Sequence, residues 1–292
     1  MHQEPSMPPV PLSPLRYPGG KTRFVPHLVE WMGESRYSSV VEPFCGGASV
    51  SLGLLRAGIV RRAILGDADH LLAHFWIAAT TMTDDLIEYM QSEPVTVARW
   101  KHWKNLDSED ILTNAMKTLF LNRTSFSGLI RHGSVLGGID QEAKMAAGVK
   151  VAYPVGCRFN KDSLAESLRR IGQWSDQGRV IAVHCDYRDT LGIVEMDGLA
   201  YLDPPYVEKS DQLYGKLFGE DCHREMARHA YRTADTGTGV TISYDDVPLI
   251  RELYADIPFH VHEPKWSYGM GKTKSSRELL ITTTDENGFE PR

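Results

Sequence analysis

Short apolar runs alternate along the chain with longer segments whose apolar residues recur at helical spacing. The runs are rich in Val, Ile or Leu and are bounded by Gly, Pro or Asp, which is typical of buried strands. Because strands that alternate with helices build βαβ units, the pattern predicts an α/β fold with a Rossmann-like, mostly parallel sheet. The seven predicted strands are Ser39–Glu42, Ala63–Asp67, Val180–Asp186, Leu199–Asp203, Gly239–Ser243, Phe259–His262 and Leu279–Thr283.

Helical spacing is clearest in the segment 163–174. It places Leu164, Leu168 and Ile171 on one face, and Asp162 or Ser163 is the expected N-cap. The segment 49–56 is followed by Ala57-Gly58, a typical C-terminal stop. The predicted helices that flank the strands are Thr22–Met32, Ser49–Arg56, Ser163–Trp174, Cys222–Ala234 and Val247–Tyr254.

The alternation stops between about Leu71 and Gly178, where the pattern is largely helical with polar, Gly-containing loops. This stretch does not fit a simple crossover between strands. We therefore predict a helical insertion at 76–178 within an α/β domain formed by residues 15–75 and 179–292. Residues 1–14 contain five prolines and predict a flexible tail.

Composition narrows the class of protein. Of the 292 residues, 42% are apolar, which is enough for a sizeable core. The chain has no apolar run of membrane-spanning length and its N-terminus lacks the apolar region of a secretory signal, so we expect no membrane association. The four cysteines are far apart and the histidines show no metal spacing, so we expect no metal site and a reducing cytoplasm. The net charge of −6 argues mildly against nucleic-acid binding, although net charge says nothing about local patches.

The most informative chemistry follows the predicted strand 199–203. Asp203-Pro204-Pro205-Tyr206 offers a carboxylate, carbonyls without partners inside this tight segment, and an aromatic ring. At the carboxyl end of a strand, these groups suit a planar base that carries a weakly basic amino group. The alternative is an ordinary strand-ending turn, since Asp and Pro are common in turns.

Two glycine-containing segments precede predicted helices. Residues 40–48 read Val-Val-Glu-Pro-Phe-Cys-Gly-Gly-Ala, in the position of a nucleotide-binding first loop, but they lack the dinucleotide fingerprint. Asp67 ends the next predicted strand, where an acid commonly binds ribose hydroxyls. In the segment 15–21, Lys21 offers a cation for a carboxylate. Taken singly, Asp67 is equally well explained as a strand-ending turn residue, and the segment 15–21 is better explained as a polar turn.

Six segments occur in a defined order, and together they resemble a known family. They are Arg16–Lys21, Glu42–Ala48, Asp67, Asn122–Leu129, Cys157–Asn160 and Asp203–Tyr206. In this order they resemble the Dam-like DNA adenine methyltransferases of the α-type motif order, over residues 15 to 284. Two positions depart from the family pattern: Cys45 precedes Gly46, and Asp69 stands where Asn is usual.

The resemblance implies S-adenosylmethionine as cofactor and a role for each matching residue. Tyr17 and Lys21 would contact its methionine end, and Asp67 its ribose. Asp203 and the Pro204 carbonyl would accept hydrogen bonds from the target amine, and Tyr206 would stack on the base. Cys45 is interpreted as a packing residue, since direct transfer needs no nucleophile. The implied cofactor-binding residues are Tyr17, Lys21, Phe44, Gly46, Gly47, Asp67, Asp186 and Asp203.

The resemblance also implies double-stranded DNA as substrate, with the target adenine flipped out of the duplex. The helical insertion would then choose the recognition sequence, and the candidate DNA-binding residues are Asn122, Arg123 and Arg131. Lys101 and Lys104 are weaker candidates, because Trp100 and Trp103 at this spacing favour a packed helix with a solvated lysine face.

Several alternatives stay open at this stage. A cytosine-N4 methyltransferase is disfavoured because that family usually has Ser in place of Asp203. A catalytically silent DNA-binding protein on the same scaffold is the rival from another class. We expect a cytoplasmic protein encoded by a bacterium or a phage. The recognition sequence, a cognate restriction endonuclease as partner and the oligomeric state are not determined by the sequence.

Overall fold

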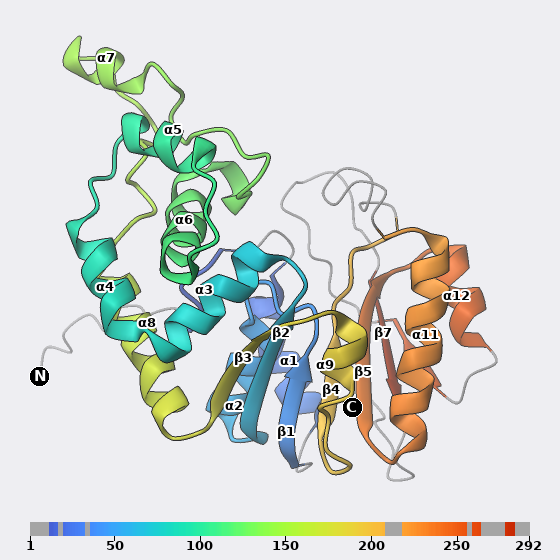
Figure 1. The fold of residues 1–292 in the computed structure, drawn as a ribbon. Coiled ribbons are helices and arrows are strands. Elements are labelled where there is room, and N and C mark those ends of the chain that lie inside the picture. The colour runs from blue at the N-terminus through green and yellow to red at the C-terminus, as the bar shows by residue number, and fades with distance from the viewer. Residues whose placement is uncertain are drawn as a thin grey trace, which may run out of the picture. The chain divides into compact units, whose positions relative to one another are not determined.

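The computed structural model describes residues 12–16, 20–32, 36–207, 218–255, 259–263 and 278–283. The chain divides into two compact units (Figure 1). One comprises residues 1–20 and 69–180 and is called the helical unit here; the other comprises 21–68 and 181–292 and is called the sheet unit. Within the described ranges, no helix combines the length and the apolar character needed to cross a membrane.

The described residues form one seven-stranded sheet in the order β3-β2-β1-β4-β5-β7-β6. β1 pairs in parallel with β2 and β4, and β4 pairs in parallel with β5. β7 runs antiparallel to both β5 and β6. This confirms the predicted seven-stranded, mostly parallel sheet. The strands are β1 (Tyr37–Glu42), β2 (Val60–Asp67), β3 (Val180–His184), β4 (Leu199–Leu202), β5 (Gly239–Asp245), β6 (Phe259–His262) and β7 (Glu278–Thr283).

Helices cover both faces of the sheet (Figure 1). On one face, α9 (Tyr187–Leu191), α11 (Glu220–Asp235) and α12 (Pro248–Ala255) share an apolar core with the inward side chains of β4, β5 and β7. The other face carries α1 (Val25–Met32), preceded by the 3-10 helix η1 (Lys21–Arg23), and α2 (Ser49–Ala57). α1 and α2 pack closely at Gly53, which has no side chain. A Cβ added there would lie only 2.4 Å from the Val25 side chain.

The helical unit contains the segment between β2 and β3, where the sequence predicts helices and no strand. Side chains cap several helices at their first turn: Asp69 accepts a hydrogen bond from the Leu71 N–H, and Asp110 accepts one from the Thr113 N–H. The target-recognition role of this segment stays a prediction. Its elements are α3 (His70–Thr81), α4 (Thr83–Ser92), α5 (Val97–Asn105), α6 (Ile111–Thr124), the 3-10 helix η2 (Phe126–Gly128), α7 (Gln141–Ala146) and α8 (Lys161–Asp176).

The structure corrects one helix boundary and confirms another. α8 is capped by Asn160, whose side chain accepts a hydrogen bond from the Ser163 N–H at 2.9 Å, so the predicted cap at Asp162 or Ser163 is wrong. The reason is geometric: a capping side chain must lie one residue before the helix and reach the N–H of its first turn. α2 ends as predicted at Gly58, whose φ of 73° lies in the left-handed region that favours glycine.

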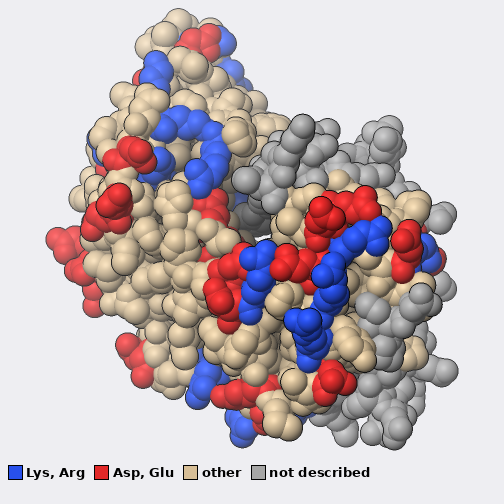
Figure 2. Space-filling model, turned by 45° about the vertical axis from the view of Figure 1, so that its right-hand side comes forward, with Lys and Arg blue, Asp and Glu red and all other residues tan. Residues whose placement is uncertain are grey.

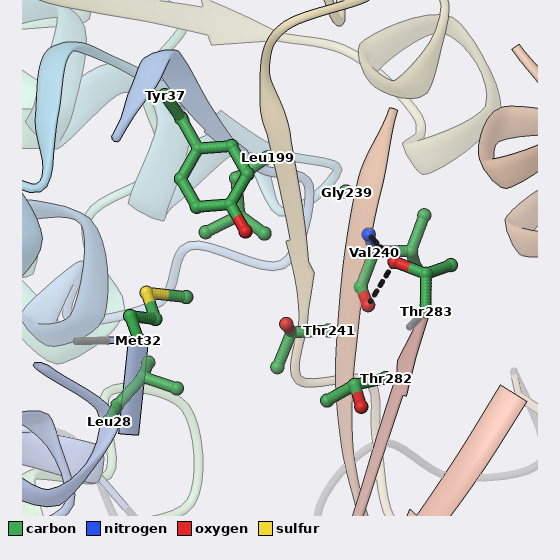
Figure 3. A pocket seen from close by; sticks show the side chains of 9 residues that line it. All are labelled: Leu28, Met32, Tyr37, Leu199, Gly239, Val240, Thr241, Thr282 and Thr283. Carbon is green, nitrogen blue, oxygen red and sulfur yellow. Dashed lines mark hydrogen bonds between the residues drawn. The ribbon is translucent and has the colours of Figure 1, made fainter. Parts of the chain in front are cut away.

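A small cavity lies at the amino edge of the sheet (Figure 3). It borders Leu199 and Gly239, the first residues of β4 and β5, and Thr283, the last residue of the antiparallel β7. The Thr283 hydroxyl accepts a hydrogen bond from the Val240 N–H at 2.9 Å and donates one to the Val240 carbonyl at 3.4 Å. At about 10 Å³, the cavity holds no more than one water, and it faces away from the edge where ligands bind in such sheets.

Candidate active site

The candidate site lies at the carboxyl edge of the sheet, between β1 and β4. The chain runs from β1 to β2 on one side, whereas the neighbour of β1 on the other side is β4. Open α/β sheets bind their ligands in the crevice at such a switch point. The loop 43–48 follows β1, and the segment 203–207 follows β4. Both predicted motifs therefore lie at this switch point.

The glycine loop after β1 is tied to the end of β2. The Gly46 N–H donates to Asp67 Oδ2 at 3.0 Å, and the Cys45 N–H donates to the Gly66 carbonyl at 2.9 Å. Gly46 has a φ of 44°, which a residue without a side chain adopts at little cost. Burial raises the pKa of the Cys45 thiol well above its usual value, with Asp67 adding to the shift. Cys45 is therefore a protonated packing residue, as interpreted from the sequence.

Glu42, the last residue of β1, holds the start of α2. Ala48 occupies the N-cap in a left-handed conformation and provides no side-chain hydrogen bond. The buried Glu42 carboxyl takes its place and accepts from the Ser51 N–H at 3.1 Å. Burial raises the pKa of Glu42 from 4.5 to about 8, the Ser51 N–H opposes the shift, and the charges of Asp203 and Asp67 add to it. Glu42 is thus largely protonated at neutral pH.

The raised pKa of Glu42 predicts a stability that depends on pH. Between pH 4.5 and about 8 the folded chain keeps a proton that the unfolded chain releases, so the free energy of unfolding falls as pH rises through this window. The fall should reach up to about 1.4 kcal/mol per pH unit. Urea unfolding of the wild type and of Glu42→Gln, measured across this range, should show a steeper fall with pH in the wild type than in the variant. A slope of equal size in both proteins would contradict the assignment.

Asp203 lies in a cluster of polar side chains at the end of β4. Its Oδ1 is 3.2 Å from Lys21 Nζ and accepts a hydrogen bond from the Ser243 hydroxyl at 3.1 Å. Lys21 Nζ also lies 3.1 Å from Glu278 Oε1. The Tyr206 hydroxyl accepts a hydrogen bond from Lys21 and donates one to the same Glu278 oxygen at 2.7 Å. One ammonium is therefore enclosed by two carboxylates and a phenol.

Burial and charge act against one another in this cluster. Burial raises the pKa of Asp203 and Lys21 lowers it, while Glu278 raises it further, so that the net direction is upward. For Lys21, burial lowers the pKa, but Asp203 and Glu278 together raise it more. Lys21, with only 4% of its side chain exposed, therefore remains a cation. That cation favours the ionised carboxylate at Asp203.

The groups predicted to contact the target base, Asp203, the Pro204 carbonyl and the Tyr206 ring, differ in their exposure to solvent. The Asp203 side chain is 24% exposed, which makes it the most accessible member of the cluster's three charged side chains. Among the described residues, none donates a hydrogen bond to Asp203 Oδ2 or to the Pro204 carbonyl. The ring of Tyr206 is half-buried, with Lys21 Nζ 4.8 Å from its centroid. As far as the described residues go, both acceptors therefore keep capacity for the two hydrogens of an amino group.

The remaining cofactor candidates occupy distinct places. Phe44 is half-buried and its ring stacks on Tyr187 of α9 at 5.5 Å. Asp186 caps α9 and accepts a hydrogen bond from the Arg188 N–H at 3.0 Å. Gly47 is buried in the loop beside Gly46. Tyr17 lies outside the described residues. The cofactor contacts of these residues stay predictions.

In the helical unit, Asn122 joins two of the sequence motifs. Its buried amide accepts from the Arg16 N–H at 2.7 Å and donates to the carbonyls of Arg16 and Gly128, at 2.7 and 3.0 Å. A side chain at Gly128 would collide with the Arg16 carbonyl, 2.4 Å from the added Cβ. The DNA contact of Asn122 stays a prediction, and these bonds favour an indirect contribution that positions Arg16.

Arg123 lies among basic side chains. Its Nε donates to the Pro14 carbonyl at 2.6 Å. Burial lowers its pKa to about 10, and the charges of Arg16 and Arg158 add to that shift. Among the described residues, no carboxylate pairs with these three arginines. The result is a concentration of uncompensated positive charge, as an anion-binding surface requires.

Arg131, the third DNA candidate, is exposed but paired. Its guanidinium makes two contacts with Asp69, Nη2 to Oδ1 at 2.7 Å and Nε to Oδ2 at 3.3 Å. Asp69, the departure from the family pattern, therefore caps α3 and orients Arg131. Lys104 donates to the carbonyls of Ile130, Arg131 and Gly133 and so holds this turn. Trp100 and Trp103 are buried, which confirms the packing interpretation of their spacing.

Charge is not segregated over the face of the sheet unit that carries α11 and α12. Figure 2 shows acidic and basic side chains interleaved there. The ion pairs account for the pattern: Arg224 pairs with Glu220 at 2.6 Å, and Arg251 with Asp246 and Glu263 at 2.6 and 2.5 Å. The described side chains of this face therefore form no continuous basic surface for a polyanion.

Three site residues had no role in the sequence interpretation: Glu42, Ser243 and Glu278. Glu42 is the first residue of the motif Glu42–Ala48, but no role was assigned to its side chain. Its place at the end of β1 was the available signal. Ser243 ends the predicted strand 239–243, and Glu278 lies one residue before the predicted strand 279–283; both strands were predicted from their apolar residues. Their polar ends at the sheet's carboxyl edge were the available signal, since that edge binds ligands.

The strand order and the segment after β4 place the sheet unit among the Rossmann-like methyltransferases. The chain belongs to the family of D12 class N6 adenine-specific DNA methyltransferases, whose family model matches residues 17–270. The implied methyl donor is of the S-adenosylmethionine type, and the implied substrate is DNA.

Named relatives agree with this assignment. The retron Ec67 DNA adenine methylase of Escherichia coli is 24% identical over 95% of this chain and 94% of its own length. The DNA adenine methylase of Vibrio cholerae is 25% identical, over 92% of this chain and 95% of its own. That of Escherichia coli K12 is 24% identical, over 91% and 93%. A provisionally assigned RNA methyltransferase structure from Pyrococcus horikoshii covers 95% of this chain and 89% of its own at 11% identity. Its TM-score of 0.40 is too low to support an argument.

Proposed function

We propose that this protein transfers a methyl group from S-adenosylmethionine to the exocyclic amine of an adenine flipped out of duplex DNA, at a specific site. The observation that carries the proposal is the state of Asp203. One carboxylate oxygen is fixed by Lys21 and Ser243, while the other has no donor among the described residues. A carboxyl group that is paired with a cation on one oxygen and presents the other matches an amino group that is about to gain positive charge.

The residues act by orientation and electrostatics. The adenine amine is a poor nucleophile, because its lone pair is conjugated with the ring. Hydrogen bonds from its two hydrogens to Asp203 Oδ2 and the Pro204 carbonyl favour a more tetrahedral nitrogen and direct its lone pair. The Tyr206 ring, whose hydroxyl is anchored by Glu278, stacks on the base. No covalent enzyme intermediate is needed, in agreement with the buried, protonated Cys45.

The loop after β1 fits the methyl donor. Gly46 and Gly47 carry no side chain between the backbone and a ligand, and Asp67 beside them supplies a carboxylate for ribose hydroxyls. When bound, the donor supplies an activated methyl group on a sulfonium. Phe44 would line the adenosine pocket, and Asp186 would lie towards the donor's adenine. In the structure Lys21 contacts Asp203 and Glu278, so its predicted contact with the donor's carboxylate would be shared with this pair.

The helical unit supplies the candidate DNA contacts. Arg16, Arg123 and Arg158 bring positive charges together, and within the described part of the chain no carboxylate pairs with them, which favours contacts to phosphates. Arg131 has the fixed, two-pronged geometry that reads base edges once it leaves Asp69. Because a stacked base hides its amine, the target must be extruded before it reaches Asp203.

Methyl transfer to duplex DNA tests the proposal. Full-length protein is incubated with labelled S-adenosylmethionine and duplex DNA, and the DNA is digested to nucleosides. We expect label in N6-methyladenine. Label in N4-methylcytosine alone would assign the cytosine reaction instead, and DNA binding without transfer of label would identify a silent DNA-binding protein.

Asp67→Ala should weaken binding of the methyl donor more than binding of DNA. The loss of a hydrogen bond between a carboxylate and ribose hydroxyls should raise the dissociation constant of the donor about tenfold to a hundredfold. Calorimetric titration with the demethylated donor product and anisotropy with labelled duplex measure the two affinities separately. Equal losses in both would argue against a ribose contact, and Asp235→Ala, an exposed change at the end of α11, serves as control.

A further inference from the structure

Glu278 occupies the catalytic edge of the sheet although it belongs to a late, antiparallel strand. It is the first residue of β7 and lies opposite Asp245, the last residue of β5. Because β7 runs antiparallel, its beginning lies at the carboxyl ends of the parallel strands. The Glu278 carboxylate is thereby brought to the site, and only 8% of the residue's surface is exposed.

A single oxygen of Glu278 connects two parts of the active site. Oε1 is 3.1 Å from Lys21 Nζ and accepts the Tyr206 hydroxyl at 2.7 Å. Lys21 is the cation beside Asp203, and Tyr206 is the ring meant for the base. Glu278 therefore reaches both ends of the Asp-Pro-Pro-Tyr segment without being part of it.

Asp203 has a second hydrogen-bond partner besides Lys21, the neutral side chain of Ser243. The Ser243 hydroxyl donates to Asp203 Oδ1 at 3.1 Å, and Ser243 Oγ lies 2.8 Å from the buried Tyr201 hydroxyl. Both anchors engage Oδ1. The orientation of the carboxylate, and with it the direction in which Oδ2 is presented, thus depends on where Lys21 and Ser243 are held.

We propose that Glu278 is a positioning residue for methyl transfer: by fixing the Lys21 ammonium and the Tyr206 hydroxyl, it orients the Asp203 carboxylate and the stacking ring for the target base. The inference rests on the proposed function, since it assigns a role within that reaction. Glu278 does not contact the base. A lysine side chain is flexible and loses considerable conformational entropy when it is fixed. Two carboxylates that share the Lys21 ammonium restrict this side chain more than a single carboxylate would.

The electrostatic consequence has a sign that can be measured. Lys21 lowers the pKa of Asp203 and Glu278 raises it, against a background in which burial raises it. Among the described residues, the charge of Asp203 also raises the pKa values of Glu42, Tyr201 and Tyr206. Neutralising Glu278 should therefore ease ionisation of Asp203, whereas neutralising Lys21 should hinder it.

Glu278→Gln in the full chain tests the assignment, with Glu278→Asp as the charge-conserving partner. In Glu278→Gln we expect kcat per active site, counted by donor-binding stoichiometry, to fall about tenfold to a hundredfold. The KM for donor and for DNA should change little, and the acid limb of the kcat–pH profile should move to lower pH. Glu278→Asp should keep the wild-type acid limb with a reduced kcat. Glu252→Gln, an exposed change on α12, should match the wild type.

The outcomes separate the inference from the function on which it rests. Wild-type kcat in Glu278→Gln, or a lower kcat with an unmoved acid limb, would overturn the positioning role while leaving the proposed function intact. If Glu278→Gln fails to fold, wild-type kcat in Glu278→Asp would overturn it. Absence of methyl transfer by the wild-type chain would overturn the proposed function, and this inference with it.

Discussion

Replacing Asp203 by alanine should reduce methyl transfer about a thousandfold, because it removes the carboxyl acceptor, paired with Lys21, that we assign to the target amine. The fold should survive, since Lys21 keeps Glu278 as its partner and the Asp203 side chain is partly exposed. Single-turnover rates with saturating donor and duplex measure the loss without interference from product release. Circular dichroism and thermal unfolding measure the fold.

The control for this variant is Asp235→Ala, which removes an exposed carboxylate from the end of α11. It should leave both the rate and the melting temperature unchanged. Turnover near the wild-type rate in Asp203→Ala would remove the proposed role of the carboxylate. A melting temperature far below that of the wild type would show that the side chain is needed for folding instead.

Lys21→Met should lower the free energy of unfolding by about 3 kcal/mol near neutral pH, since it leaves the buried Glu278 and the partly exposed Asp203 without their shared cation. The loss should shrink as pH falls, because protonation of Asp203 relieves the repulsion. The pH dependence of kcat/KM should change as well. Without Lys21 the pKa of Asp203 rises, so the acid limb of kcat/KM should move to higher pH.

Urea unfolding at several pH values and the pH profile of kcat/KM measure the two effects of Lys21→Met. Arg56→Met, an exposed change on α2 of the same unit, is the matched control for loss of a positive charge. An unmoved acid limb together with wild-type stability would contradict the ion-pair cluster. A shift to lower pH would contradict the sign of the interaction between Lys21 and Asp203.

Most of the sheet could be predicted from the sequence, because each strand is a short apolar run with a clear boundary. β6 was predicted at the bounds that the structure gives, and the beginnings of β3, β4 and β5 agree. The catalytic segment was identifiable because Asp-Pro-Pro-Tyr ends an apolar strand, and the switch-point rule then brings it beside the loop after β1. Local pattern and topology therefore suffice for these parts.

The contacts that tune the site could not be predicted, because they join residues far apart in the chain. Lys21 and Glu278 are 257 positions apart, and the register of β7 against β5 decides that they meet. The family resemblance implied that Lys21 would contact the methionine end of the cofactor, and its place between two side-chain carboxylates had no signal in the sequence. The role of Asn122 depends likewise on the return of the chain to Arg16.

A crystal structure of the full chain with a non-reactive donor analogue and a duplex that contains its target adenine tests the central claim most directly. The account predicts that the adenine is extruded and that its N6 lies within hydrogen-bond distance of Asp203 Oδ2 and the Pro204 carbonyl, with Lys21 still against Oδ1. An Asp203 carboxylate turned away from an extruded base, or an adenine that remains stacked in the duplex, would contradict it.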